Sequence, residues 1–322
     1  MKFPALILML CALAAVMGGA AACFFPAMSS LKPTLVAAEQ RQSANALLSM
    51  LQTGCSVLGP TAGGLVVAVS GAPAGFAANA ATYLVSVATV ALIRTRVGRS
   101  DRRGMLVEIV EGWQEIRSRD WLLSGVLAAT VYHVANGVIL VLVQVIAVER
   151  LGGAGAVGVI AAAEGLGGLV GAAVALRVRP RHPLRAGWLA LLLMPVWAIS
   201  YVWPGALAAV LLGAVLGYGG LLFFSVAWET ALQDHVPHRV LARVSSWDIL
   251  TSFIGMPLGN ALAGPLADTF GLNQVMVACA AVLLAAALAP LSVTGTRALQ
   301  RPFPLPVISA HAVTAEAANS AG

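Results

Sequence analysis

The sequence predicts an all-α integral membrane protein with about nine transmembrane helices. Of its 322 residues, 59% are hydrophobic and only 10% are charged, and the mean hydropathy is +0.89. Soluble domains average roughly 45–50% apolar and about 25% charged residues, so this composition excludes soluble enzymes, disordered chains and disulfide scaffolds. The apolar stretches lack the period-two alternation of barrel strands. Helices are therefore expected, because they satisfy their backbone hydrogen bonds within one segment.

Nine apolar stretches approach the length of about 20 residues that a spanning helix needs. They are 3–25, 46–69, 74–93, 121–148, 154–176, 186–203, 205–228, 249–272 and 273–293. Pro and Gly mark joins between them, as at residues 71–73 and 203–205. Residues 1–23 also fit a cleavable signal peptide; we favour an uncleaved first helix, because the segment has one Lys and the apolar run continues past Cys23.

The basic residues are distributed asymmetrically along this arrangement. Seventeen of the 19 lysines and arginines fall in segments on one side of the membrane, and only Lys2 and Arg150 fall on the other. By the positive-inside rule, we expect a multi-pass protein of the cell membrane with its N-terminus outside and its C-terminus in the cytoplasm. The net charge of +6 then reflects topology and contact with anionic lipid rather than nucleic-acid binding.

A weak internal repeat relates the stretch 3–93 to the stretch 205–293. Transporter folds commonly show such symmetry between halves. Three helices precede the later unit and none precedes the earlier one, so we expect that three helices of an originally symmetric arrangement are absent from the front. The expected division is an incomplete N-terminal half 1–93, a basic cytoplasmic central loop 94–120, a six-helix C-terminal half 121–296 and a disordered cytoplasmic tail 297–322.

Short motifs accompany this repeat in both halves. They are Phe25-Pro26-Ala27, Ala44-Asn45-Ala46, Leu58-Gly59-Pro60-Thr61-Ala62-Gly63-Gly64, Trp228-Glu229-Thr230-Ala231-Leu232-Gln233, Leu241-Ala242-Arg243-Val244-Ser245-Ser246, Pro257-Leu258-Gly259 and Ala263-Gly264-Pro265-Leu266-Ala267-Asp268. Together they resemble the major facilitator superfamily, in its branch of drug, macrolide and siderophore exporters. The run at 58–64 resembles the Gly-Pro-x-x-Gly-Gly signature of helix 5 in drug/proton antiporters. The family's Gly-x-x-x-Asp-Arg loop between helices 2 and 3 has no match.

This resemblance implies a facilitator-type bundle in which the nine stretches correspond to helices 4–12 of a twelve-helix fold. It also implies a membrane transporter that couples export of a small amphipathic compound to protons. The alternative is a truncated, non-transporting membrane subunit or a remnant of such a transporter. In that case a partner would supply the missing helices. The expected partners otherwise are the lipid bilayer and a small-molecule substrate, and not nucleic acid.

Glu164 lies near the centre of the apolar stretch 154–176. A charged carboxylate at membrane depth costs several kcal/mol unless it is paired, so we expect Glu164 to face a cavity or to be protonated. Proton coupling requires a carboxyl group that gains and loses a proton, which makes Glu164 the candidate for this role. The alternative is a neutral, hydrogen-bonded structural residue or one exposed in a wet crevice.

A polar face runs along the stretch 121–148. His133 and Asn136 are spaced i and i+3, and Gln144 continues the face at i+11 after an apolar position. In the family this helix lines the central cavity, so the resemblance implies that these three residues line it here. His133 is at a depth similar to that of Glu164, so the two could pair. The alternative is that Asn136 and Gln144 form hydrogen bonds between helices.

The glycine-rich run contains Gly59, Pro60, Gly63 and Gly64. Pro removes a backbone donor and bends a helix, while Gly permits close packing or a hinge. Combined with the resemblance, the run indicates a transport-related hinge. A second glycine-rich run, 165–171, is more typical of an ordinary helix-packing face.

The segment 229–248 is expected to be a loop that carries several charges. Its candidate cytoplasmic gate consists of Glu229, Arg243 and Asp248, with Arg243 bound to Asp248 or to Glu229. Such an ion pair would steady one gating state, although it contributes little when it is exposed.

No metal, cofactor or enzymatic site is expected. Asp234, His235 and His238 lack a fourth zinc ligand. The sequence also has no phosphate-binding Gly loop with Lys, no His-Glu-x-x-His and no nucleophile elbow.

Overall fold

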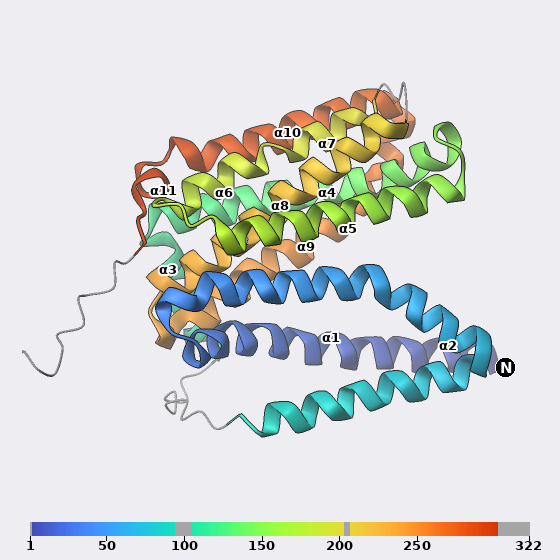
Figure 1. Cartoon of the computed structure of the whole chain (residues 1–322), viewed down its shortest axis with the longest axis horizontal. Coiled ribbons are helices and arrows are strands. Elements are labelled where there is room, and N and C mark those ends of the chain that lie inside the picture. Colours follow the sequence, from blue (N-terminus) through green and yellow to red (C-terminus); the bar gives the residue numbers. More distant parts are fainter. Residues whose placement is uncertain (1, 94–104, 203–206, 302–322) are drawn as a thin grey trace, which may run out of the picture.

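The computed structural model of the chain describes residues 2–93, 105–202 and 207–301 (Figure 1). Every regular element within these ranges is a helix, and seven helical segments among them are long and apolar enough to cross a membrane. The all-α integral membrane fold is therefore confirmed. In chain order the elements are α1 (Lys2–Leu35), the 3-10 helix η1 (Ala38–Gln40), α2 (Arg41–Ala91), α3 (Met105–Arg117), α4 (Asp120–Arg150), α5 (Ala154–Arg177), α6 (Pro183–Leu191), α7 (Met194–Ser200), α8 (Leu207–His235), α9 (His238–Phe270), α10 (Leu272–Ser292) and α11 (Thr294–Ala298).

The element α2 consists of two antiparallel helices that meet at Gly71 (Figure 1). Gly71 has φ +82° and ψ 165°, a conformation that is essentially restricted to glycine. The two expected stretches 46–69 and 74–93 therefore lie on either side of a reversal at Gly71, and the join expected at 71–73 is confirmed. The other expected join, 203–205, lies outside the described residues.

The expected stretch 186–203 corresponds to the two short helices α6 and α7. The interruption falls at Leu192 and Leu193, just before Pro195 in the first turn of α7. Pro has no amide hydrogen to donate to the preceding turn, so α6 cannot continue into α7 with unbroken hydrogen bonds.

The buried core lies among the helices from α4 to α10, where Trp188, Trp197 and Tyr201 are among the largest fully buried side chains. Glycines of α5 bring this helix close to α8. A Cβ atom at Gly171 would lie only 2.0 Å from the carbonyl oxygen of Gly219. The glycine run 165–171 is thus a packing face, as its spacing indicates.

By contrast, α1 and α2 expose many apolar side chains. Val69 and Phe76 of α2 are each 77% exposed. Exposure of apolar groups has no hydrophobic cost in a bilayer, because lipid tails are as apolar as these side chains.

One end of the bundle, which we call the basic end, gathers residues 30–45, 105–121, 177–185, 229–248 and 292–301 (Figure 1). The segment 94–120 stays a predicted cytoplasmic connection between the halves, and its described part contains helix α3. One expectation for this end is corrected. The segment 229–248, expected as a loop, is helical apart from a short break before α9. Pro237 caps α9 at that break, and the polar turns on both sides extend the apolar helices.

Candidate functional site

Ion pairs at the basic end join α1 and α2 to α8. The Nζ atom of Lys32 lies 3.2 Å from Oε1 of Glu229, and Nη1 of Arg41 lies 2.8 Å from Oδ1 of Asp234. Arg41 also donates to the carbonyl oxygen of Gln233 at 3.0 Å. The Arg41 and Asp234 side chains are only 13% and 8% exposed, so water screens this pair less than the first.

Uncharged polar groups extend the same contact into buried surroundings. Asn45 Nδ2 donates to Thr230 Oγ1 at 3.0 Å and to Gln233 Oε1 at 3.1 Å. Gln42 Nε2 donates to the carbonyl oxygen of Val178 at 2.7 Å. Sequence reasoning assigned no role to Gln42 or Asn45; the available signal was the polar Asn45 within the motif at 44–46 and Gln42 just before it.

Helix α3 docks on the first turns of α9. Arg243 forms an ion pair with Glu111 of α3, and the rings of Trp113 and Trp247 lie 5.4 Å apart. Trp247 Nε1 also donates to the carbonyl oxygen of Ile109 at 3.0 Å. This packing places a charged helix along the first turns of α9.

The three gate candidates each contact a residue outside their expected pairs. Glu229 pairs with Lys32, Arg243 pairs with Glu111, and Asp248 accepts a hydrogen bond from Trp228 Nε1 at 3.1 Å. Sequence reasoning looked for partners within 229–248 and missed those on α1 and α3. Only tertiary packing brings these helices against α8 and α9. A gating role for the three residues stays a prediction.

Away from the basic end, α2 diverges from the C-terminal helices. A Cβ atom at Gly168 of α5 would lie 3.1 Å from Thr53 Cγ2, whereas one at Gly59 or Gly63 would meet nothing within 4 Å. Figure 1 shows the first part of α2 turning away from α5 before the chain reverses direction.

The expected hinge lies within this diverging part of α2. Its backbone is helical through Gly59, Pro60, Gly63 and Gly64, and the non-helical position falls at Gly71 instead. A hinge at the four residues therefore stays a prediction.

Glu164 lies half-buried on α5 and faces α7 and α8. Its carboxyl group is close enough to interact with the Tyr218 hydroxyl and the Trp197 indole, and its charge also acts on Tyr201. The rings of Trp197 and Tyr218 pack edge to face with centroids 5.5 Å apart. Sequence reasoning missed these aromatic neighbours; the signal was their polar atoms within otherwise apolar helices.

Two polar atoms beside Glu164 lack a well-formed hydrogen bond. The Tyr201 hydroxyl and Trp197 Nε1 are both buried and have no hydrogen-bond partner among the described residues. A buried donor without a partner is costly, so this cluster has unused capacity to bind a carboxylate or water.

His133 belongs to a different helix interface, and Asn136 follows it one turn later on the same helix. His133 Nδ1 lies 2.6 Å from the carbonyl oxygen of Ala129, and its Cβ would lie 3.0 Å from a Cβ atom at Gly255 of α9. Asn136 is buried, and its Oδ1 has no partner among the described residues. Gln144 is exposed.

The contacts of His133 and Glu164 do not indicate a pair between them. His133 packs between α4 and α9, whereas Glu164 faces α7 and α8. The two residues lie at similar depth on consecutive helices, but depth alone does not determine which neighbouring helix each side chain faces. Whether His133, Asn136 and Gln144 line a cavity stays a prediction.

Two of the three residues considered as zinc ligands, Asp234 and His235, have other partners. Asp234 binds Arg41, and the ring nitrogens of His235 lie 3.1 Å from the carbonyl oxygen of Ala231 and 3.0 Å from that of Gln300. No cluster of three potential metal ligands occurs within the described ranges.

Long apolar helices, a charged basic end and an ionisable group on the central helix α5 define a multi-pass helical membrane protein. The family model of the Major Facilitator Superfamily matches residues 1–260, and the chain belongs to this family. It is 28% identical over 275 residues to the uncharacterized MFS-type transporter y4rN of Sinorhizobium fredii (strain NBRC 101917 / NGR234). That match covers 82% of this chain and 66% of y4rN, so the chain spans slightly less than two thirds of this relative.

Proposed function

We propose that the chain is a membrane transporter that exports a small amphipathic compound in exchange for protons. The observation that carries the proposal is the asymmetric contact between α2 and the C-terminal helices. A largely buried ion pair and buried hydrogen bonds join them at the basic end, while α2 diverges from α5 toward the opposite end. Alternating access needs such an arrangement, in which two helical bodies close one end of a path and open the other.

The proposed orientation places the basic end in the cytoplasm of the cell membrane, following the positive-inside rule. The pairs Lys32–Glu229 and Arg41–Asp234 then hold the cytoplasmic end closed in the state observed. Opening this end would separate both pairs and expose their charges to water. Hydration of the separated charges offsets part of that cost, as a reversible gate requires.

Glu164 is the proposed proton-coupling residue. A charged carboxylate at this depth needs donors, and the Tyr218 hydroxyl and Trp197 indole are placed to supply them. Protonation removes the negative charge and weakens this attraction between α5 and its neighbours α7 and α8. Protonation thereby changes which packing of the three helices is favoured. This change would couple proton binding to the conformation of the transporter.

The test is pH-gradient-driven movement of cationic dyes in proteoliposomes that contain the full chain. We expect flux with the native protein and a loss of at least about tenfold with Glu164→Gln, because the amide cannot release a proton. Glu149→Gln is the matched control, since Glu149 is an exposed carboxyl group near the end of α4, and it should keep native flux.

Two results would contradict parts of this proposal separately. Absence of flux for every cationic dye tested would reject the exporter function. Flux that persists unchanged in Glu164→Gln would leave the exporter standing and reject Glu164 as its coupling residue.

A further inference from the structure

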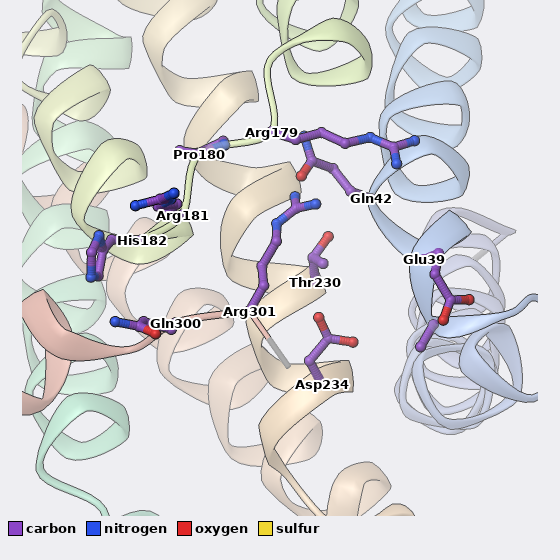
Figure 2. A pocket seen from close by; sticks show the side chains of 11 residues that line it. Glu39, Gln42, Arg179, Pro180, Arg181, His182, Thr230, Asp234, Gln300 and Arg301 are labelled. Atoms are coloured by element: carbon purple, nitrogen blue, oxygen red, sulfur yellow. The ribbon is translucent and has the colours of Figure 1, made fainter. Parts of the chain in front are cut away.

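A second site with its own chemistry lies at the basic end. A pocket of about 700 Å³ opens where the connection between α5 and α6 faces the start of α2 and the end of α8 (Figure 2). It is distinct from the surroundings of Glu164 and shares no lining residue with them. The lining residues are Ala38, Glu39, Gln42, Arg179, Pro180, Arg181, His182, Thr230, Asp234, Gln300 and Arg301.

Three arginines from two separate segments line this pocket. Arg179 and Arg181 follow α5, and Arg301 follows α11. Figure 2 shows the Arg301 side chain extending across the pocket toward the side that carries Arg179. The Arg301 amide donates to the carbonyl oxygen of Arg181 at 3.3 Å, and this hydrogen bond fixes where the side chain enters the pocket.

The three arginines outnumber the two acidic lining residues, Glu39 and Asp234. Asp234 is also paired with Arg41 at 2.8 Å. Arg179 donates to Ser43 Oγ, a neutral acceptor, at 2.9 Å. The pocket therefore carries an excess of positive charge.

Arg301 shows this excess most directly. Its Nε and Nη2 atoms are buried and have no hydrogen-bond partner among the described residues. Burial and the nearby Arg179 guanidinium lower the pKa of Arg301, while Asp234 acts in the opposite direction. Buried guanidinium nitrogens without acceptors are unfavourable, and an anion in the pocket would relieve that cost.

We propose that this pocket binds a phosphate group, carried either by a dissolved anion or by the headgroup of an anionic phospholipid. The planar guanidinium presents paired N–H donors that match phosphate oxygens, so Arg301 with Arg179 and Arg181 forms a suitable cradle. Both sources of the phosphate group can reach the pocket, because it lies at the ends of membrane-spanning helices rather than among their centres.

The test measures binding to the purified full chain and does not depend on transport. One arm titrates inorganic phosphate against the protein in uncharged detergent. The other compares thermal stability in phosphatidylcholine nanodiscs with and without phosphatidylglycerol. We expect Arg301→Gln to weaken phosphate binding by about tenfold, because it removes a charge-assisted hydrogen bond. In nanodiscs the same variant should lose stabilisation by phosphatidylglycerol that corresponds to about tenfold weaker binding of the lipid.

Arg297→Gln is the matched control. It removes the same charge at the same end, but Arg297 is exposed and donates to the carbonyl oxygen of Ser292 outside the pocket. Arg179→Gln is a second pocket variant in case Arg301→Gln fails to fold, and it should weaken binding in the same direction.

A response in the phosphate arm would identify a dissolved anion as a sufficient ligand. A response restricted to phosphatidylglycerol would identify the lipid headgroup. The proposal is overturned if neither arm responds, or if Arg297→Gln has the same effect as the pocket variants.

Discussion

Gly171 allows α5 and α8 to approach closely, because it has no side chain. A Cβ atom there would lie 2.0 Å from the Gly219 carbonyl oxygen, and the contacting atom is backbone that cannot rotate away. Close backbone approach stabilises helix pairs in membranes through van der Waals contact. Any side chain at this position must therefore separate the helix that carries Glu164 from one of its aromatic neighbours.

We predict that Gly171→Ala lowers the free energy of unfolding by about 1–3 kcal/mol, the usual cost of overpacking a tight contact. Thermal unfolding in detergent would measure the change. Gly158→Ala on the same helix is the control, because a Cβ atom there meets nothing within 4 Å. Equal loss of stability in the two variants would show that the Gly171 contact is not close in solution.

Glu164 illustrates what can be inferred from one residue. Its depth in an apolar stretch identified it as unusual, since a membrane-embedded carboxyl group is expensive unless it is paired or functional. Its neighbours could not be read from the sequence. Trp197 and Tyr218 are distant along the chain and meet Glu164 only because α7 and α8 pack against α5.

At the scale of elements, the contact between α2 and α8 is one of the connections that the proposed transport cycle would break. The Arg41–Asp234 pair joins the first residue of α2 to the last turn of α8 and is nearly buried. Because both side chains lose much of their hydration, removing one partner alone leaves an uncompensated charge on the other.

We predict a coupling free energy of about 1–3 kcal/mol between Arg41→Gln and Asp234→Asn in a double-mutant cycle on unfolding, since the residues are in direct contact. The control cycle joins Arg150→Gln with Asn273→Ala, an exposed contact of 2.8 Å near the opposite end of the bundle. That control should couple by less than about 0.5 kcal/mol. Similar coupling in both cycles would remove the reason to treat the basic end as a gate.

Element boundaries were harder to predict than element existence. The apolar runs identified each long helix, but the charged segments 94–120 and 229–248 were both expected to be loops. Helix α3 and the polar turns of α8 and α9 form because helical hydrogen bonding continues beyond the apolar layer. The apolar face of α3, which carries Trp113 and Ile116, then packs against the rest of the protein: Ile116 is buried and Trp113 contacts Trp247.

For the whole molecule, the asymmetry of charge predicts orientation. We expect alkaline phosphatase fused at Gly152 to be active outside the cell, and a green fluorescent protein fused after Gly322 to fluoresce in the cytoplasm, because basic segments resist translocation. A phosphatase fusion at Arg181, at the basic end, is the control and should be inactive. The reverse pattern would contradict the proposed topology and would place the closed, basic end outside the cell.

The sequence by itself determined the class of protein, the positions of most of the long helices, and the asymmetry of charge between their ends; it predicted nine spanning helices, whereas seven segments of the described residues are long and apolar enough to span. These features follow from the local cost of placing polar backbone and charge in lipid, which depends on composition and spacing alone. The tertiary structure decided the partners: Lys32 with Glu229, Arg243 with Glu111, Tyr218 and Trp197 with Glu164, and the three arginines around one pocket. Helices in a bilayer are all apolar on the outside, so their packing directions depend on close contacts between distant residues.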